Sequence, residues 1–190
     1  MTISYVGAKA EYFLWHNRIG IAAGLRFSNY SSTFDSDKEY FLWLLRQDRL
    51  TTDYAKIQNI TQNSYYVGVP LEFRFFPNNH DWFFQHYFKL GAAFNYRLST
   101  NNSVTFQNAA MNRHAQTVED QVDKPQDFNA YLYPVIGFKM ARLPWFNLEL
   151  HFPCGMFSSE GSAFIRPNAG FGIQFSVQIP LGKTYPVGTE

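Results

Sequence analysis

Hydrophobic and polar residues alternate with a period of two along much of this chain. In residues 65–76, Val67, Leu71 and Phe73 share one face, while Glu72 and Arg74 lie on the other. Strict alternation is typical of β-strands whose two faces meet different environments. The same pattern marks segments 6–14, 19–28, 65–76, 84–98, 128–141, 146–156 and 168–181, so we predict an all-β fold.

The apolar faces of these segments carry no Asp, Glu, Lys or Arg. The segments are also longer than the soluble mean of about 5–6 residues, and a tilted strand needs about 9–11 residues to cross a bilayer. We therefore predict an antiparallel up-and-down transmembrane β-barrel whose charge-free faces touch lipid. Its interior would then hold the charged residues of the opposite faces: Lys9, Glu11, Arg26, Glu72, Arg74, Lys89, Arg97, Lys139 and Glu149.

The connections between the segments alternate in length. Those at 16–18, 77–82 and 143–145 are short, whereas those at about 29–63, 99–127 and 157–167 are long and polar. Outer-membrane barrels have short periplasmic turns and long outer loops. Aromatic residues gather near the short turns and are expected to form an interfacial girdle: Phe13, Trp15, Phe75, Phe76, Trp82, Phe83, Phe84, Trp145 and Phe146.

The strand count is odd, although a bacterial barrel has an even number of strands with both ends inside. We expect eight strands, of which seven are visible and the N-terminal one is missing from this chain, unless another element covers the open edge. On this reading residues 1–182 form the barrel and residues 183–190 a periplasmic C-terminal tail.

Several segments also resemble a known family. "YYVGVPLEFRFF", "FKLGAAFNYRL" and "GFGIQFSVQIPL" are similar to strands of the small, porin-like outer-membrane β-barrel proteins of Bacteroidetes, and "GAKAEYFLWHNRIGIAAGLRFSNY" looks like that family's second and third strands. The resemblance spans nearly the whole chain and implies an eight-stranded barrel in the bacterial outer membrane. It implies no catalytic residues and does not identify a transported substrate.

Composition excludes several classes of function. The net charge is only +1 and the basic residues are scattered, so nothing favours a nucleic-acid partner. The single cysteine, Cys154, excludes an internal disulfide and is expected to face lipid. No histidine pair has a metal-binding spacing, so we expect no metal and no cofactor. His86 would face lipid with no Ser or Glu beside it, and His151 would face the lumen, so we expect no enzymatic activity.

The barrel interior admits three interpretations. Eight strands enclose a space that side chains can fill, and buried charges need partners, so a mutually paired network that plugs the lumen is favoured. A small, weakly anion-preferring channel is the first alternative. The second is a soluble lipocalin-like ligand-binding barrel, in which the apolar faces would line a cavity.

An apolar cluster interrupts the first long loop. It comprises Tyr40, Phe41, Leu42, Trp43, Leu44 and Leu45. It is interpreted either as a short amphipathic helix that covers the barrel mouth or lies on the membrane, or as a docking surface for another protein. The sequence thus predicts an outer-membrane barrel with a structural or interaction role, for which a subunit of a larger envelope complex is the candidate setting. Its expected partners are the lipid bilayer with its lipopolysaccharide and other outer-membrane proteins.

Overall fold

The computed structural model describes residues 2–14, 18–36, 40–47, 52–77, 84–140, 145–152, 154–157 and 172–179; the side chains at 47, 52, 145, 154–157 and 178 are not part of this description. Within these ranges, no helix is long and apolar enough to cross a membrane. The elements in chain order are β1 (Thr2–Leu14), β2 (Ile19–Asp35), β3 (Phe41–Gln47), β4 (Thr52–Phe75), β5 (Phe84–Phe106), the 3-10 helix η1 (Ala109–His114), α1 (Ala115–Gln121), β6 (Phe128–Met140), β7 (Trp145–His151), β8 (Cys154–Phe157) and β9 (Gly172–Gln178).

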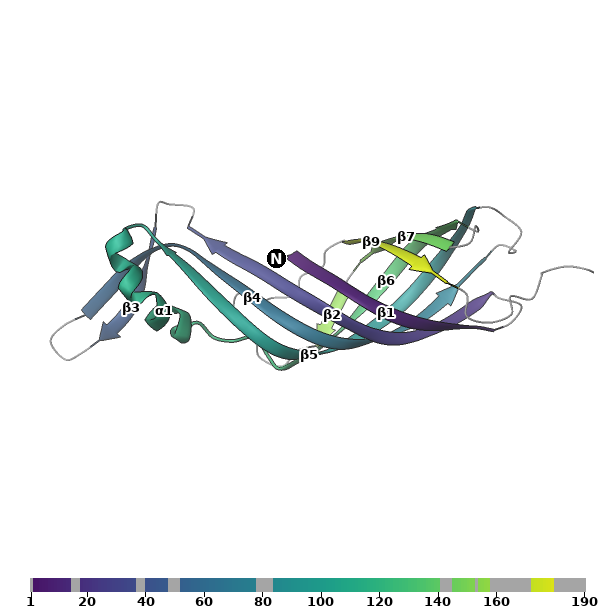
Figure 1. The fold of residues 1–190 in the computed structure, drawn as a ribbon, viewed down its shortest axis with the longest axis horizontal. Coiled ribbons are helices and arrows are strands. Elements are labelled where there is room, and N and C mark those ends of the chain that lie inside the picture. Colours follow the sequence, from purple (N-terminus) through teal and green to yellow (C-terminus); the bar gives the residue numbers. More distant parts are fainter. Residues whose placement is uncertain are drawn as a thin grey trace, which may run out of the picture.

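All strands belong to one antiparallel sheet in the order β1-β2-β4-β5-β6-β7-β9. The sheet is strongly curved and forms a half-barrel (Figure 1). The short strand β8 pairs with β6 directly beyond β7, so β7 and β8 act as one interrupted strand. This main path corresponds to the seven strands that the alternation predicts, and the predicted fold class is confirmed.

The two faces of the sheet have the predicted orientation. Outward side chains such as Leu71, Phe73 and Phe88 are about half exposed, at 47%, 47% and 51%. Inward side chains such as Lys89 and Glu149 are buried, at 3% and 0% exposure. Apolar side chains therefore face the surroundings, and charged side chains fill the inside of the curved sheet.

The strands extend well beyond the lipid-facing segments, which the sequence analysis did not predict. β2 continues to Asp35, β4 begins at Thr52 and β5 reaches Phe106, although 29–63 and 99–127 were expected to be loops. The prediction was wrong because Ser, Thr, Asn and Gln occupy both faces there. The few apolar residues among them, such as Tyr30, Ile60 and Phe106, are too widely spaced to give a continuous period of two.

The cluster 40–45 forms most of strand β3, so the expected helix is wrong. β3 continues the line of β2 along the same edge of β4: Asp35 lies opposite Asn59 and Phe41 opposite Ile57. A run of six apolar residues fits either a helix or a strand, and here the pairing with β4 decides in favour of a strand.

The extended parts of β3, β4 and β5 build a small second core with α1. Ala55, Ile57, Ile60, Phe106, Val118 and Val122 are buried in it, and Phe41, Trp43 and Leu45 pack against it. Trp43 Nε1 donates to Gln121 Oε1 at 2.7 Å, which fixes α1 on β3. Figure 1 shows this extension, with β3 and α1, at the end of the molecule opposite β9.

Two strand prolines interrupt the ladders, as expected for a residue that lacks an N–H. On its β2 side, Pro70 falls between the pairs Arg26–Gly68 and Ala23–Leu71 and is itself not paired. On the β7 side, the ladder of β6 stops at Val135, next to Pro134, and resumes at Leu132 with a register shift. Pro153 and Pro180 lie outside the described residues.

The ends of the sheet path are β1 and β9. Because each strand is antiparallel to its neighbour, β1 and β9 run in the same direction. No ladder joins them within the described residues, although the Tyr5 hydroxyl of β1 donates to Gln174 Oε1 of β9 at 2.7 Å.

Candidate functional site

The interior of the barrel is the candidate functional site, and β4 gives its layers in order. From Phe76, which directly follows the strand at the short-turn end, every second residue upward faces inward: Phe76, Arg74, Glu72, Pro70, Gly68, Tyr66, Ser64 and Gln62 are all buried. Alternation places these side chains at successive heights in the lumen. Three levels follow, namely an aromatic floor, an ionic middle and a polar upper part.

The middle level is a continuous network of ion pairs. The Glu72 carboxylate accepts from Lys9 Nζ at 2.8 Å and lies 3.2 Å from Lys89 Nζ. The Glu149 carboxylate lies 2.5 Å from Lys89 Nζ and 3.2 Å from Arg74 Nη2. Arg74 Nη1 also donates to Glu11 Oε2 at 3.1 Å. Three cations and three carboxylates therefore alternate across the lumen, and their formal charges cancel.

Hydroxyl groups complete the coordination of both central carboxylates. Tyr87 donates to Glu149 Oε1 at 2.5 Å, and Tyr133 donates to Glu72 Oε1 at 2.8 Å. His151 Nε2 lies 2.9 Å from Glu149 Oε2. Buried carboxylates are costly unless several hydrogen bonds satisfy them, and each of these two has at least three partners.

Glycines provide the space for the two tyrosine rings. Gly91 lies opposite Tyr133 and Gly137 opposite Tyr87 in the β5–β6 ladder. A Cβ atom at either glycine would stand 2.2 Å from Cζ of the facing ring. Only glycine leaves room for each ring to lie flat against the neighbouring strand and reach a carboxylate.

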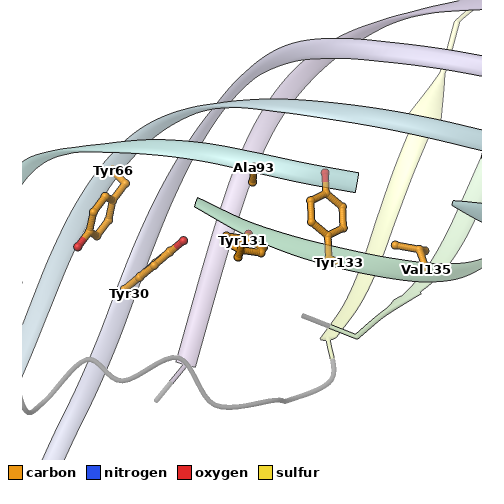
Figure 2. Close-up of a cluster of buried hydrophobic side chains, with 6 residues drawn as sticks. All are labelled: Tyr30, Tyr66, Ala93, Tyr131, Tyr133 and Val135. Atoms are coloured by element: carbon orange, nitrogen blue, oxygen red, sulfur yellow. The ribbon is translucent and has the colours of Figure 1, made fainter. Parts of the chain in front are cut away.

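Tyrosines and amides fill the level above the ionic network. Figure 2 shows Tyr30 beside Tyr66 at one end of this cluster, with Tyr131 and Tyr133 of β6 further along it. The Tyr30 and Tyr66 ring centroids are 4.6 Å apart. Arg26 Nη2 donates to the Tyr131 hydroxyl at 2.6 Å, and the guanidinium lies 4.9 Å from the Tyr5 ring centroid. Arg26 thus pairs with aromatic rings and an amide instead of a carboxylate.

The floor of the lumen is aromatic. The Phe13 and Phe76 ring centroids are 6.0 Å apart, and Lys139 Nζ lies 5.3 Å and 5.5 Å from them. These two phenylalanines were expected in the lipid-facing girdle, and that prediction is wrong because their strand phase turns them inward. Of the other girdle residues, Phe75, Phe84 and Phe146 are exposed on the outside. Trp145 begins β7, but its side chain is not described, and Trp15, Trp82 and Phe83 lie outside the described residues.

Residues 122–127, called here the covering segment, pass over the upper end of the lumen between α1 and β6. The inward side chain of Gln62 donates to Asp123 O at 2.9 Å. The Tyr66 hydroxyl donates to Gln126 O at 3.5 Å, and Pro125 is buried. At the rim, Arg97 pairs with Asp127 through both its side chain and its backbone N–H.

Six of the nine charged residues singled out in the sequence lie in the ionic network: Lys9, Glu11, Glu72, Arg74, Lys89 and Glu149. Arg26 lies one level above it, Lys139 on the floor and Arg97 at the rim. Two important residues were missed. Tyr5 precedes the first predicted strand, and Asp127 was assigned to a loop. The alternating pattern therefore assigned neither residue to the inner or the outer face of the sheet.

The described residues contain no group of three or more His, Cys, Asp and Glu that could hold a metal ion. His86 lies on the outer face, and His151 faces the lumen beside Glu149. Cys154 belongs to β8, where side chains are not described. The arrangement of the described charges is suited to their mutual neutralisation.

An apolar exterior, a polar interior and long antiparallel strands together define a transmembrane β-barrel of the bacterial outer membrane. The comparison with protein families agrees, because residues 4–160 match the outer membrane protein beta-barrel domain. The chain belongs to that family, and its location is the bacterial outer membrane. The comparisons found no match among curated proteins and none among solved structures. The alternative of a soluble lipocalin-like barrel is wrong, because the apolar faces point outward.

The ionic network predicts a large loss of stability when one central carboxylate is neutralised. Glu149→Gln leaves Lys89 and Arg74 buried beside an uncharged amide, so the free energy of unfolding should fall by about 3–5 kcal/mol. Urea titration of the protein in lipid vesicles measures it. The matched control is Asp127→Asn, whose partner is Arg97 at the rim and whose side chain is 66% exposed; it should cost at most about 1 kcal/mol. Equal losses in the two variants would contradict a central role for Glu149.

Proposed function

We propose that this protein is a non-catalytic outer-membrane barrel whose lumen is plugged by side chains and whose role is structural or interactive. The observation that carries the proposal is the neutral network of Lys9, Glu72, Lys89, Glu149, Arg74 and Glu11. Its central side chains are 0–6% exposed, apart from Glu11 at 9% and Lys9 at 22%. An ion that crossed the lumen would have to break these pairs.

A small anion-preferring channel is the second candidate. Arg26 and Lys139 give the interior more cations than carboxylates, which favours anions over cations. The paired network, the aromatic floor and the covering segment all favour the plug instead. We therefore rank the channel below it.

The plug predicts that the purified protein does not conduct ions. In a planar lipid bilayer with salt on both sides, it should produce no discrete current steps above the lipid baseline, because side chains occupy every level of the lumen. Insertion is checked on the same sample by the heat-dependent gel mobility typical of folded barrels. Reproducible steps with anion selectivity would support the channel and contradict the plug.

We further propose that the barrel is closed by an eighth strand between β1 and β9, as in a porin-like barrel of the Bacteroidetes type. A single strand antiparallel to both would satisfy their backbone groups, which are costly to leave unpaired in lipid. The contact between Tyr5 and Gln174 supports this, because it shows the two edges facing the same narrow lumen.

The eighth strand predicts a definite pattern of amide hydrogen exchange in β1. Successive amides of an antiparallel strand point alternately to its two neighbours, so a free edge leaves every second amide unprotected. We expect slow exchange at all central amides of β1 in the protein taken from the outer membrane. Residues 88–96 of β5, paired with β4 on one side and β6 on the other, serve as the internal control. Alternating fast and slow exchange in β1 would show that its edge is free.

The interaction role is assigned to the outer face of the β3–β4 hairpin. Leu42, Leu44 and Tyr54 are 60%, 42% and 51% exposed there, next to one another in the ladder. Tyr40 lies beside them, with Lys56 Nζ 4.5 Å from its ring centroid. A cluster of exposed apolar side chains on the extension fits a contact with another protein of the envelope. We place this end of the barrel outside the cell, because the long connecting segments of outer-membrane barrels lie on that side.

This assignment predicts that two outward leucines control the assembly state. The wild-type protein extracted in mild detergent should sediment as a complex heavier than one chain, and Leu42→Ser/Leu44→Ser should release it as a monomer. Each leucine that the contact would bury contributes about 1–2 kcal/mol to binding, which is roughly tenfold in affinity. Phe34→Ser is the control, since Phe34 is 51% exposed but packs against Phe41 on the other face. A complex that survives the double substitution would contradict the assignment.

A further inference from the structure

The outer face of the sheet changes character abruptly above the lipid-facing belt. On β2 the outward positions that follow Phe27 are Asn29, Ser31 and Thr33, and on β4 those above Val67 and Tyr65 are Asn63, Thr61 and Asn59. Uncharged hydroxyl and amide groups thus replace phenylalanine, leucine and valine within one or two positions. We call this surface the polar field.

Strand pairing makes the polar field a continuous surface. On β5, Ser99 lies opposite Tyr65, Asn101 opposite Asn63 and Ser103 opposite Thr61. One row runs without interruption across four strands, through Thr2, Ser31, Asn63 and Asn101. The row below the field consists of Val6, Phe27, Val67 and Tyr96, which belong to the lipid-facing belt. The field is therefore adjacent, along its whole width, to the surface that faces hydrocarbon.

The rows of the polar field carry no lysine or arginine, and their one ionised side chain among the described residues is Asp35, opposite Asn59 in the uppermost row. Lys56 of β4 lies on the same outer face beyond that row, opposite Leu42. The ion pair of Arg97 with Asp127 lies at the rim of the lumen, on the other face of β5. Phosphate groups are normally bound by arginine and lysine, which the field lacks. Serine, threonine and asparagine offer uncharged donors and acceptors, the chemistry that pairs with sugar hydroxyl groups. Thr33 and Thr61 hold two such oxygens 3.1 Å apart on this face.

The depth of the polar field exceeds that of a phospholipid headgroup layer. From Ser99 to Thr105 on β5, a strand rises roughly 20 Å, or about 15 Å along the membrane normal at the usual tilt. The headgroup layer of an ordinary bilayer is only about 5–8 Å thick on each side. A surface of this depth that begins at the edge of the hydrocarbon matches a thicker, hydroxyl-rich layer.

We propose that the polar field is a contact surface for uncharged saccharide headgroups of outer-leaflet glycolipids. The proposal rests on the placement of the extension outside the cell, made above with the proposed function. The lipid-facing belt holds the acyl chains, and the field directly above it hydrogen-bonds the sugars attached to them. Contact with the sugars rather than with phosphate is what the absence of Lys and Arg from these rows indicates.

The test measures which lipids stay on the protein. The full chain is placed in lipid nanodiscs that contain equal amounts of a neutral glycolipid with an oligosaccharide headgroup and phosphatidylglycerol with the same acyl chains. Native mass spectrometry of the released protein then counts the lipids retained. We expect at least a threefold excess of glycolipid on the wild-type protein. The excess should disappear in Ser31→Ala/Asn63→Ala/Asn101→Ala, which removes one row of polar groups.

A matched variant separates the polar field from polar surface in general. Asn112→Ala/Gln116→Ala removes two exposed amides of η1 and α1, outside the field, and should leave the glycolipid excess unchanged. Equal retention of both lipids by the wild-type protein, or an excess that survives the triple substitution, would overturn the proposal. Preference for phosphatidylglycerol would also overturn it, since it would assign the layer to phosphate. None of these outcomes affects the plug, which is tested independently by the absence of current steps.

Discussion

The structure depends on the absence of water from the hydrocarbon of a membrane. A backbone or side-chain polar group there has to find its partner within the protein, because it cannot find one in the lipid. Long paired strands satisfy the backbone, and alternation turns every charged side chain of the barrel segments inward. The apolar belt, the interior network and the inward tyrosines are three consequences of this single constraint.

Charges that are forced into a narrow lumen must then neutralise one another. Glu72 and Glu149 do this by each collecting two cations and a tyrosine hydroxyl, with Lys89 shared between them. The tyrosines reach the carboxylates only because Gly91 and Gly137 have no side chain that would occupy the space of the facing ring. Side chains from β1, β4, β5, β6 and β7 therefore meet at one level, and the network binds the curved sheet together across its interior as well as along its ladders.

The sequence was sufficient to predict the barrel segments, because phenylalanines, leucines and valines opposite lysines and glutamates give a strong contrast between faces. It also indicated which charges point inward. It did not reveal which carboxylate each cation contacts, since that depends on the register between strands far apart in the chain, as with Arg74 and Glu149.

The extension was missed for a different reason. Between Asn29 and Asp35, and again between Asn59 and Ser64, polar residues occupy positions on both faces and interrupt the apolar ones, so the period of two gives only a weak hydrophobic signal. The apolar residues of β3 were visible, but their secondary structure depends on pairing with β4. The inward position of Phe13 and Phe76 was not predicted. They were placed in the girdle because they lie near a short turn, although the alternation puts them on the same face as the inward residues.

Strand β4 runs without a break from the tip of the extension to the floor of the barrel. Residues 52–63 alone reach roughly 40 Å beyond the lipid-facing part, at about 3.3 Å per residue. The same backbone forms the wall and the tip, and its ladder with β5 joins the two, with irregularities at Ile57/Asn59 and at Tyr65/Tyr66. A protein bound to the β3–β4 hairpin, as proposed above, would therefore be held at a set distance from the membrane by paired strands.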